Sequence, residues 1–291
     1  LAVTEAILLA CRLEATARKP GNVHPEASFA DTSFEDFISS AEAVAPILSR
    51  ARSSGIGPSV LAAVQAARKR SPQNTNLGIV LLLAPLSAVP RRQTLAAGLP
   101  AVLADLGVDD AEAVYQAIRL ASPGGLGRVE TEDVSDTPRV TLLEAMRLAA
   151  HRDSIAAQYV NGFCDVLEFG LPFLAGNRDF SSRWEEAVIE LHLRLMARRP
   201  DTLIARKCGF DIANESAHRA AAVLDAGWPH SEGGREMLGD LDQWLRADGN
   251  RRNPGTTADL VAACLFAGVR EGALEASPFL DIARSRRVVR S

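Results

Sequence analysis

Apolar residues recur at steps of three and four along almost the whole chain, which is the spacing of amphipathic α-helices. In residues 2–17, for example, Val3, Ala6, Ile7 and Ala10 fall on one side. No long alternating run favours a sheet, and no Asn-Gly or Asp-Gly pair lies between β-branched runs. The best strand-like stretch, residues 129–140, is mostly acidic and polar. The pattern therefore predicts an all-α fold.

The expected helices follow closely on one another. Ser33 is suited to cap a helix that runs to about Arg52, with acidic residues in its first turn. Residues 76–88 are apolar all round, which predicts a helix buried in the core. Further helices are expected over 58–70, 90–104, 109–121, 139–150, 152–168, 179–198, 210–226, 231–247 and 255–271. With no internal repeat or Pro/Ser-rich linker, we expect residues 1–291 to form one compact domain of roughly ten or more helices.

Composition argues against several classes of protein. The net charge is −4, from 32 Lys+Arg and 36 Asp+Glu, and only 5% of residues are aromatic. These values do not suit a nucleic-acid binder with a broad basic surface or serial base stacking. The longest apolar run, residues 77–89, is shorter than the ~20 residues that span a bilayer. The four cysteines form no CxxC pair and the start of the chain shows no signal-peptide pattern, so we expect a cytoplasmic protein with neither membrane nor nucleic-acid partners.

Polar segments that contain Gly or Pro interrupt the helices. Four of them cover residues 18–26, 73–78, 201–209 and 253–260, and a looser fifth covers 123–136. The long connections 19–33 and 122–138 are of a length that is usually functional or disordered. We expect the segments to meet at one site, although each also has a purely structural interpretation.

Two of these segments have the chemistry of a phosphate site. Gly255, Thr256 and Thr257 open a helix, where N–H groups and hydroxyls can bind an anion or simply cap the helix. The pairs Arg18-Lys19 and Arg206-Lys207 would clamp a polyphosphate if they converge, or lie at solvated helix ends if they do not.

Acidic and amide side chains are the remaining candidates for binding a metal or a ligand. Two sets of carboxylates are candidate Mg²⁺ ligands: Asp259, one turn into the helix of the last polar segment, and the cluster of Glu130, Glu132, Asp133 and Asp136. A solvated acidic loop is the alternative interpretation of the cluster. Asn74-Thr75-Asn76 can cap a helix or contact a ligand. The chain has no HExxH, GxSxG or P-loop motif, and its Gly125-x-Gly127 lacks the context of a dinucleotide site.

Together and in this order, the segments resemble the triphosphoribosyl-dephospho-CoA synthase family, known from prosthetic-group assembly for citrate lyase and malonate decarboxylase. The resemblance runs from about Glu14 to Leu265. The matching pieces are Glu14 with Lys19-Pro20-Gly21-x-Val23, Phe37, Asn74-Thr75-Asn76-x-Gly78, Asp201-Thr202 with Arg206-Lys207-x-Gly209, and Pro254-Gly255-Thr256-Thr257-Ala258-Asp259-Leu260.

The resemblance implies an enzyme of coenzyme biosynthesis that moves the triphosphoribosyl group of ATP to the ribose 2′-hydroxyl of 3′-dephospho-CoA, with release of adenine. It implies Mg²⁺ as the cofactor. The residues implied in catalysis are Glu14 or Asp31 as the base, with Asn74 and Asp201. Those implied in ATP and phosphate binding are Lys19, Gly21, Asn22, His24, Asn76, Arg206, Lys207, Gly255, Thr256 and Thr257, and those for the metal are Glu132, Asp201 and Asp259.

Several different functions remain compatible with the sequence. Asn22 and His24 replace an apolar residue and an Asp of the better-known branch, and Pro-Gly-Thr-Thr replaces its Pro-Gly-Gly-Ser. The acceptor could therefore be another coenzyme precursor, such as one of a methanopterin type. A helical metal-dependent nucleotide phosphohydrolase and a non-catalytic nucleotide-binding protein also fit the pattern. The sequence leaves the oligomeric state open, with a homodimer as one option.

Overall fold

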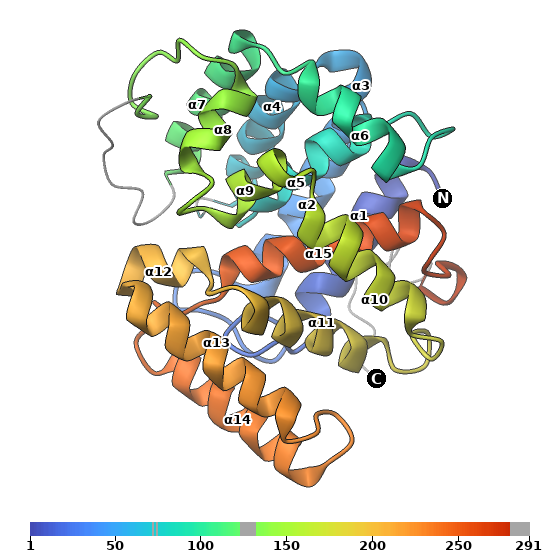
Figure 1. The fold of residues 1–291 in the computed structure, drawn as a ribbon, viewed down its shortest axis with the longest axis vertical. Helices are drawn as coiled ribbons and strands as arrows, with labels where there is room; N and C mark the ends of the chain where they lie inside the picture. Colours follow the sequence, from blue (N-terminus) through green and yellow to red (C-terminus); the bar gives the residue numbers. More distant parts are fainter. Residues whose placement is uncertain (72, 74, 123–131, 280–291) are drawn as a thin grey trace.

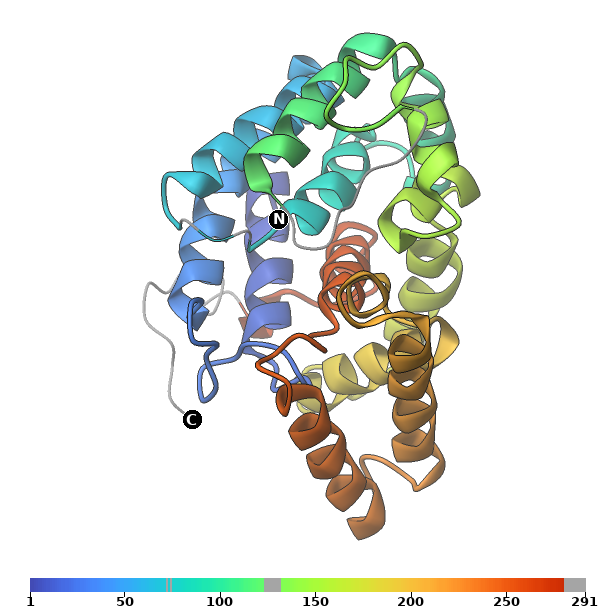
Figure 2. The same ribbon diagram turned by 90° about the vertical axis from the view of Figure 1, so that its left-hand side faces the viewer.

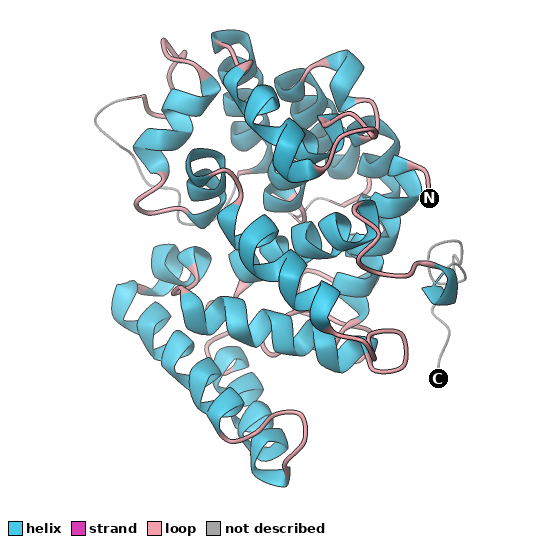
Figure 3. Cartoon of the chain, turned by 45° about the vertical axis from the view of Figure 1, so that its right-hand side comes forward, coloured by secondary structure: helices cyan, strands magenta, loops and turns pink. Residues whose placement is uncertain are grey.

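The all-α prediction is confirmed by a computed structural model, which describes residues 1–71, 73, 75–122 and 132–279. This part of the chain contains fifteen α-helices and no sheet, and Figure 3 shows helices joined by loops. The helices, labelled in Figure 1, are α1 (Val3–Thr16), α2 (Phe34–Leu48), α3 (Ala51–Ser54), α4 (Ile56–Arg68), α5 (Leu77–Ala88), α6 (Leu95–Ala104), α7 (Val108–Ala121), α8 (Leu142–Ala149), α9 (Ser154–Asn161), α10 (Leu171–Gly176), α11 (Trp184–Arg198), α12 (Thr202–Cys208), α13 (Phe210–Asp225), α14 (Glu232–Arg246) and α15 (Gly255–Arg270).

Two apolar helices, α5 and α15, form the centre of the larger core. Almost every residue of α5 is buried, as the apolar run over 76–88 predicts. The long helix α15 packs against α5 and against the N-terminal helix α1. Helices with no polar face must be surrounded by others. The remaining helices of this core therefore pack around α5 and α15 (Figure 1).

A second, smaller core lies among α11, α12, α13 and α14. Its buried side chains include Leu193, Ile204, Val223 and Leu245. Figure 2 shows α13 and α14 side by side, extending away from the other helices. The connection 17–33 is attached to this unit, since the N–H of Gly21 donates to Asp242 Oδ1 at 2.7 Å. Gly21 has φ +74° and a Cβ there would lie 2.8 Å from Leu245 Cβ, so this contact requires glycine.

Two expectations about local structure are wrong. The helix expected over 152–168 ends at Asn161, because Gly162 (φ 71°) and Phe163 (φ 62°) are left-handed, and a π-helix follows over Asp165–Gly170. Residues 201–209, expected as a polar loop, contain α12. Asp201 caps its start and Gly209, with φ +93°, follows its end.

In the described residues, no helix has the length and apolar character to cross a membrane. The organisation of the whole of residues 1–291 as one domain stays a prediction, because 280–291 lie outside the described part.

Candidate active site

A cavity of about 1330 Å³ lies between α7–α9 on one side and α12 with the start of α15 on the other. Residues of α1, α5, the connection 17–33 and the segment 249–253 also contribute to its wall. In Figure 1, α7–α9 lie above α12. Residues from all four polar segments that we expected to converge, and from the described part of the fifth, line this one cavity.

The structure places most of the expected site residues at the cavity. Those that line it are Glu14, Asn22, Asp31, Asn76, Glu132, Arg206, Lys207, Gly255, Thr256 and Asp259. Those that do not are Lys19, Gly21, His24, Asp201 and Thr257. Asn74 lies outside the described residues, as does Glu130.

Lys19 lies behind the cavity wall, and our expectation that it contacts phosphate is not supported by its position. Its side chain is fully buried, and Nζ lies 3.0 Å from Glu14 Oε1. The ammonium also donates to the carbonyl oxygens of Glu14 and Ala17. These three partners match its three donors, so Lys19 holds the Glu14 carboxylate in place.

Asp201 and Thr257 are joined beneath the site, which corrects their expected roles. Oδ1 of Asp201 accepts from the N–H groups of Leu203 and Ile204 at 2.8 and 3.0 Å. Oδ2 accepts from the N–H and the hydroxyl of Thr257 at 2.7 and 2.8 Å. Burial raises the pKa of Asp201, and these four hydrogen bonds act against that effect. Because both oxygens are engaged, Asp201 fixes the start of α12 against the start of α15 and has no lone pairs left for a metal.

Gly21 and His24 also make contacts within the protein and do not line the cavity. Gly21 makes the contacts to α14 described above. The ring Nδ1 of His24 accepts from the Glu26 N–H at 3.3 Å, and its backbone pairs with Ala27. Burial and nearby Arg246 lower the pKa of His24. Between them, Asn22 does reach the cavity, and its amide nitrogen donates to Asn253 Oδ1 at 2.7 Å.

Asp259 faces the cavity from α15 and lies against the backbone of α5. A Cβ added at Gly78 would come within 2.0 Å of Asp259 Oδ2, so a larger residue there would displace this carboxylate. Burial raises the pKa of Asp259 well above its usual range, and the carboxylates of Glu14, Asp201 and Asp153 act in the same direction. Arg206 opposes them. Acidic groups from α1 and from the N-caps of α9 and α12 thus lie around the Asp259 carboxyl group, which favours a cation here.

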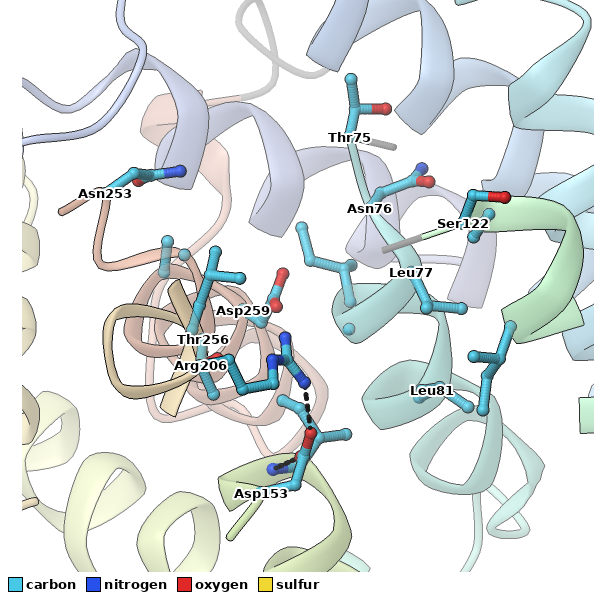
Figure 4. A pocket seen from close by; sticks show the side chains of 18 of the residues that line it. Thr75, Asn76, Leu77, Leu81, Ser122, Asp153, Arg206, Asn253, Thr256 and Asp259 are labelled. Carbon is cyan, nitrogen blue, oxygen red and sulfur yellow. Dashed lines mark hydrogen bonds and ion pairs between the residues drawn. The ribbon is translucent and has the colours of Figure 1, made fainter. Parts of the chain in front are cut away.

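The cationic side of the cavity is built on α12. Arg206 Nη1 donates to Asp153 Oδ2 at 2.8 Å, and Figure 4 shows this pair below Thr256 and Asp259. Asp153 also caps α9 through its other oxygen. Burial and neighbouring Arg206 lower the pKa of Lys207. The sequence analysis missed Asp153, whose sequence signal is only that of a helix cap.

Three buried polar atoms at the cavity wall have no hydrogen-bond partner within the described part of the chain. They are Asn22 Oδ1, Asn76 Nδ2 and Arg206 Nε. Leaving such an atom unsatisfied costs about 1–3 kcal/mol. Because all three residues line the same cavity, a polar ligand there would supply the missing partners.

Asp259 is the best placed of the expected metal ligands, because its carboxylate faces the cavity among other acidic groups. Glu132 also lines the cavity, but its Oε2 accepts from the Arg139 N–H at 3.1 Å. The described residues contain no group of three or more His, Cys, Asp or Glu arranged to hold a metal alone. A cation at Asp259 would need further ligands from a substrate.

A comparison with known protein families identifies the family of this chain. The model of the ATP:dephospho-CoA triphosphoribosyl transferase family matches residues 1–277. The chain belongs to this family. Proteins from Pseudomonas savastanoi pv. phaseolicola and Pseudomonas syringae pv. tomato, both named probable 2-(5''-triphosphoribosyl)-3'-dephosphocoenzyme-A synthase, are 37% identical over 117 residues. These matches span 40% of this chain and 40% of each relative.

A solved structure extends the likeness over most of the fold. It is a candidate triphosphoribosyl-dephospho-CoA synthase from Archaeoglobus fulgidus, 27% identical, with a TM-score of 0.64. The match covers 81% of this chain and 100% of that one. Within the ATP:dephospho-CoA triphosphoribosyl transferase family, the all-α architecture therefore has an experimental example.

Proposed function

We propose that this chain transfers the triphosphoribosyl group of ATP to the ribose 2′-hydroxyl of 3′-dephospho-CoA and releases adenine. Family membership and the names of its relatives support this activity. The observation that carries the proposal is a large cavity with cationic and carboxylate groups on one wall. Its volume of about 1330 Å³ exceeds the roughly 300–1,000 Å³ of ordinary small-molecule sites. Two nucleotide-sized substrates therefore have room to meet in it.

Glu14 is the general base in this proposal. The reaction forms a bond between the acceptor's 2′-oxygen and C1′ of the ATP ribose, and breaks the bond from C1′ to adenine. The hydroxyl proton must be taken up as the oxygen attacks, and a positioned carboxylate contributes typically about 10²–10⁴-fold. Lys19 holds the Glu14 carboxylate at the cavity wall. Asp31, the second candidate base, is exposed at the cavity and accepts from the Thr32 hydroxyl at 3.0 Å, so Glu14 is the better placed of the two.

The triphosphate lies against α12 and the start of α15 in this proposal. Arg206 and Lys207 supply cationic groups there, and Thr256 supplies a hydroxyl. Arg206 has a free Nε although its Nη1 is paired with Asp153. Phosphate oxygens accept such N–H groups strongly. At the start of α15 the N–H of Thr257 is bonded to Asp201 and that of Gly255 to the Asn253 carbonyl, so this helix end contributes chiefly its positive dipole.

We also propose that Mg²⁺ accompanies ATP at Asp259. In proteins Mg²⁺ is usually held by one or two carboxylates together with substrate phosphates. Asp259 fits this pattern, because burial and the surrounding carboxylates raise its pKa and a cation would favour its charged form. When bound, the ion would offset part of the phosphate charge. Asp201 is not part of this site.

The cysteines support a location for the reaction. All four, Cys11, Cys164, Cys208 and Cys264, are free thiols. Free thiols are typical of reducing compartments. We therefore place the enzyme in the cytoplasm.

The decisive test of the function is adenine release. The protein is incubated with ATP and Mg²⁺, with and without 3′-dephospho-CoA, and free adenine and the triphosphoribosyl adduct are measured by mass spectrometry. We expect adenine and adduct in equal amounts, and only when the acceptor is present. Adenine formed only with a different acceptor would keep the chemistry and replace the substrate. Phosphate release without adenine would indicate a hydrolase, and ATP binding without turnover would indicate a binding protein.

Gly78→Ala tests whether the position of Asp259 matters for this reaction. The new methyl group would overlap Asp259 Oδ2 and force the carboxylate to move. A displacement of about 1 Å can cost ~10²-fold in rate, so we expect kcat/KM for adenine release to fall by about that factor. The matched control is Gly239→Ala on α14, whose added Cβ meets nothing within 4 Å. Equal activity of the two variants would show that the position of Asp259 does not matter for the reaction.

A further inference from the structure

One end of the cavity is apolar. The side chains of Leu81 on α5, Val114 and Ile118 on α7, Leu142 and Met146 on α8, and Ile155 on α9 all line it. We call these six residues the apolar lobe. Five of them belong to the larger core, and Ile118 packs against it. Well-packed interiors leave few voids larger than a water molecule, so an apolar wall that opens into a large cavity indicates a ligand with an apolar body.

The α5 end of the apolar lobe, at Leu81, lies across the cavity from Arg206 (Figure 4). Figure 4 shows Leu81, Leu77 and Asn76 on one side, with Arg206, Thr256 and Asp259 on the other. A ligand that spans the cavity would therefore place an apolar end against α5 and α7–α9 and an anionic end against α12. A nucleotide has this arrangement, with its base at one end and its anionic phosphates at the other.

One polar group at the edge of the lobe lacks a partner. Asn76 is 8% exposed and lines the cavity, and its Nδ2 has no hydrogen-bond partner among the described residues. It also makes no capping bond to α5. The hydroxyls nearby are engaged: Ser122 donates to the Arg119 carbonyl at 2.9 Å and Tyr115 to the Glu132 carbonyl at 2.8 Å. The amide of Asn76 is therefore available to a ligand that brings an acceptor to an apolar setting.

We propose that the apolar lobe is an adenine subsite, with Asn76 donating to a ring nitrogen. This inference rests on the proposed function, because both substrates of that reaction carry adenine. Aliphatic side chains cover the two faces of the flat ring, and the ring's acceptor nitrogens satisfy the Asn76 amide. The adenine belongs either to ATP, as the leaving group, or to the acceptor.

Ile118→Trp, which fills the lobe from a partly exposed position on α7, is the test. Its matched control is Leu120→Trp, since Leu120 is 37% exposed on the same helix and is not part of the cavity wall. Four ligands are titrated singly against the full-length chain: ATP, 3′-dephospho-CoA, inorganic tripolyphosphate and 4′-phosphopantetheine. We expect Ile118→Trp to weaken the binding of ATP or dephospho-CoA by about tenfold or more. The affinities for the two adenine-free ligands should stay within about twofold of the wild-type values. The wild type and Leu120→Trp should agree for all four.

The pattern of losses identifies the source of the adenine. A loss for ATP alone assigns the lobe to the donor, and a loss for dephospho-CoA alone assigns it to the acceptor. The proposal would be overturned if the affinity for tripolyphosphate fell as much as that for the adenine ligands. It would also be overturned if dephospho-CoA and phosphopantetheine both bound more weakly while ATP binding stayed unchanged. Unchanged binding of all four ligands by a folded variant would also overturn it.

Asn76→Leu provides a second test that does not crowd the lobe. It keeps the side-chain size and removes only the amide, and we expect about fivefold weaker binding of the same adenine ligand. If Ile118→Trp does not fold, this variant decides the question alone, and binding equal to wild type would count against the proposal. Each titration uses one ligand without turnover, so these results stand whether or not the transfer assay releases adenine.

Discussion

Glu14→Gln is expected to lower kcat for adenine release by about 10²–10⁴-fold, because the amide cannot accept the proton of the attacking hydroxyl. The side chain keeps its size, and its amide oxygen still accepts from Lys19 Nζ, which lies 3.0 Å from Oε1. We therefore expect KM for ATP to change little. Steady-state adenine release measured over a range of ATP concentrations separates the two quantities.

The control for this variant is Glu42→Gln. Glu42 is a half-exposed carboxylate on α2 that pairs with Arg12 at 2.8 Å and does not line the cavity. Its replacement should leave kcat unchanged. If Glu14→Gln retains kcat within a few fold of the wild type, Glu14 is not the base, and Asp31 becomes the carboxylate to test.

Lys19→Met is expected to destabilise the protein strongly. It would leave the Glu14 carboxylate, whose side chain is only 6% exposed, without its countercharge. Removing one partner of a buried ion pair costs about 3–5 kcal/mol. For a chain of this size each kcal/mol lowers Tm by about 2–4 °C, so a decrease of about 6–20 °C is expected in thermal unfolding followed by circular dichroism.

A rescue experiment separates this loss from a simple packing defect. Adding Glu14→Gln to Lys19→Met removes the isolated charge, so the double variant should melt at a higher temperature than Lys19→Met alone. Lys69→Met, at an exposed lysine, should change Tm by little. A Tm of Lys19→Met within about 2 °C of the wild type would show that the pair contributes little to stability.

Helical periodicity predicted the fold class well, because most helices bury one side or, for α5, every side. The start of α2 was also predictable, since Ser33 and Asp36 form a local cap. The end of α9 at Asn161 was not predictable. It depends on Gly162 and Phe163 taking left-handed conformations, and an apolar residue such as Phe163 gives no local signal for that.

The residues of the candidate site were only partly predictable for a similar reason. Polar segments with Gly and Pro marked the chain positions that reach the cavity, such as Asn76, Arg206 and Asp259. Whether a given side chain faces the cavity depends on packing from distant parts of the chain. Lys19 turns inward to Glu14, and Asp201 bonds to Thr257, which is 56 residues away. The apolar lobe could not be predicted either, because Met146 and Ile155 look like ordinary core positions in the sequence.

The packing of α1 against α15 has a consequence for synthesis of the protein on the ribosome. α1 is synthesised well before α15, which is complete only after residue 270 has been added. At about 5–20 residues per second, α1 waits roughly 13–50 s for α15, although α2, its other main packing partner, follows it directly. During that interval apolar residues of α1 such as Ile7 and Leu13, which end fully buried, lack part of their final cover. A chain released before α15 is complete therefore leaves one side of α1 uncovered and lacks the cavity wall that carries Thr256 and Asp259.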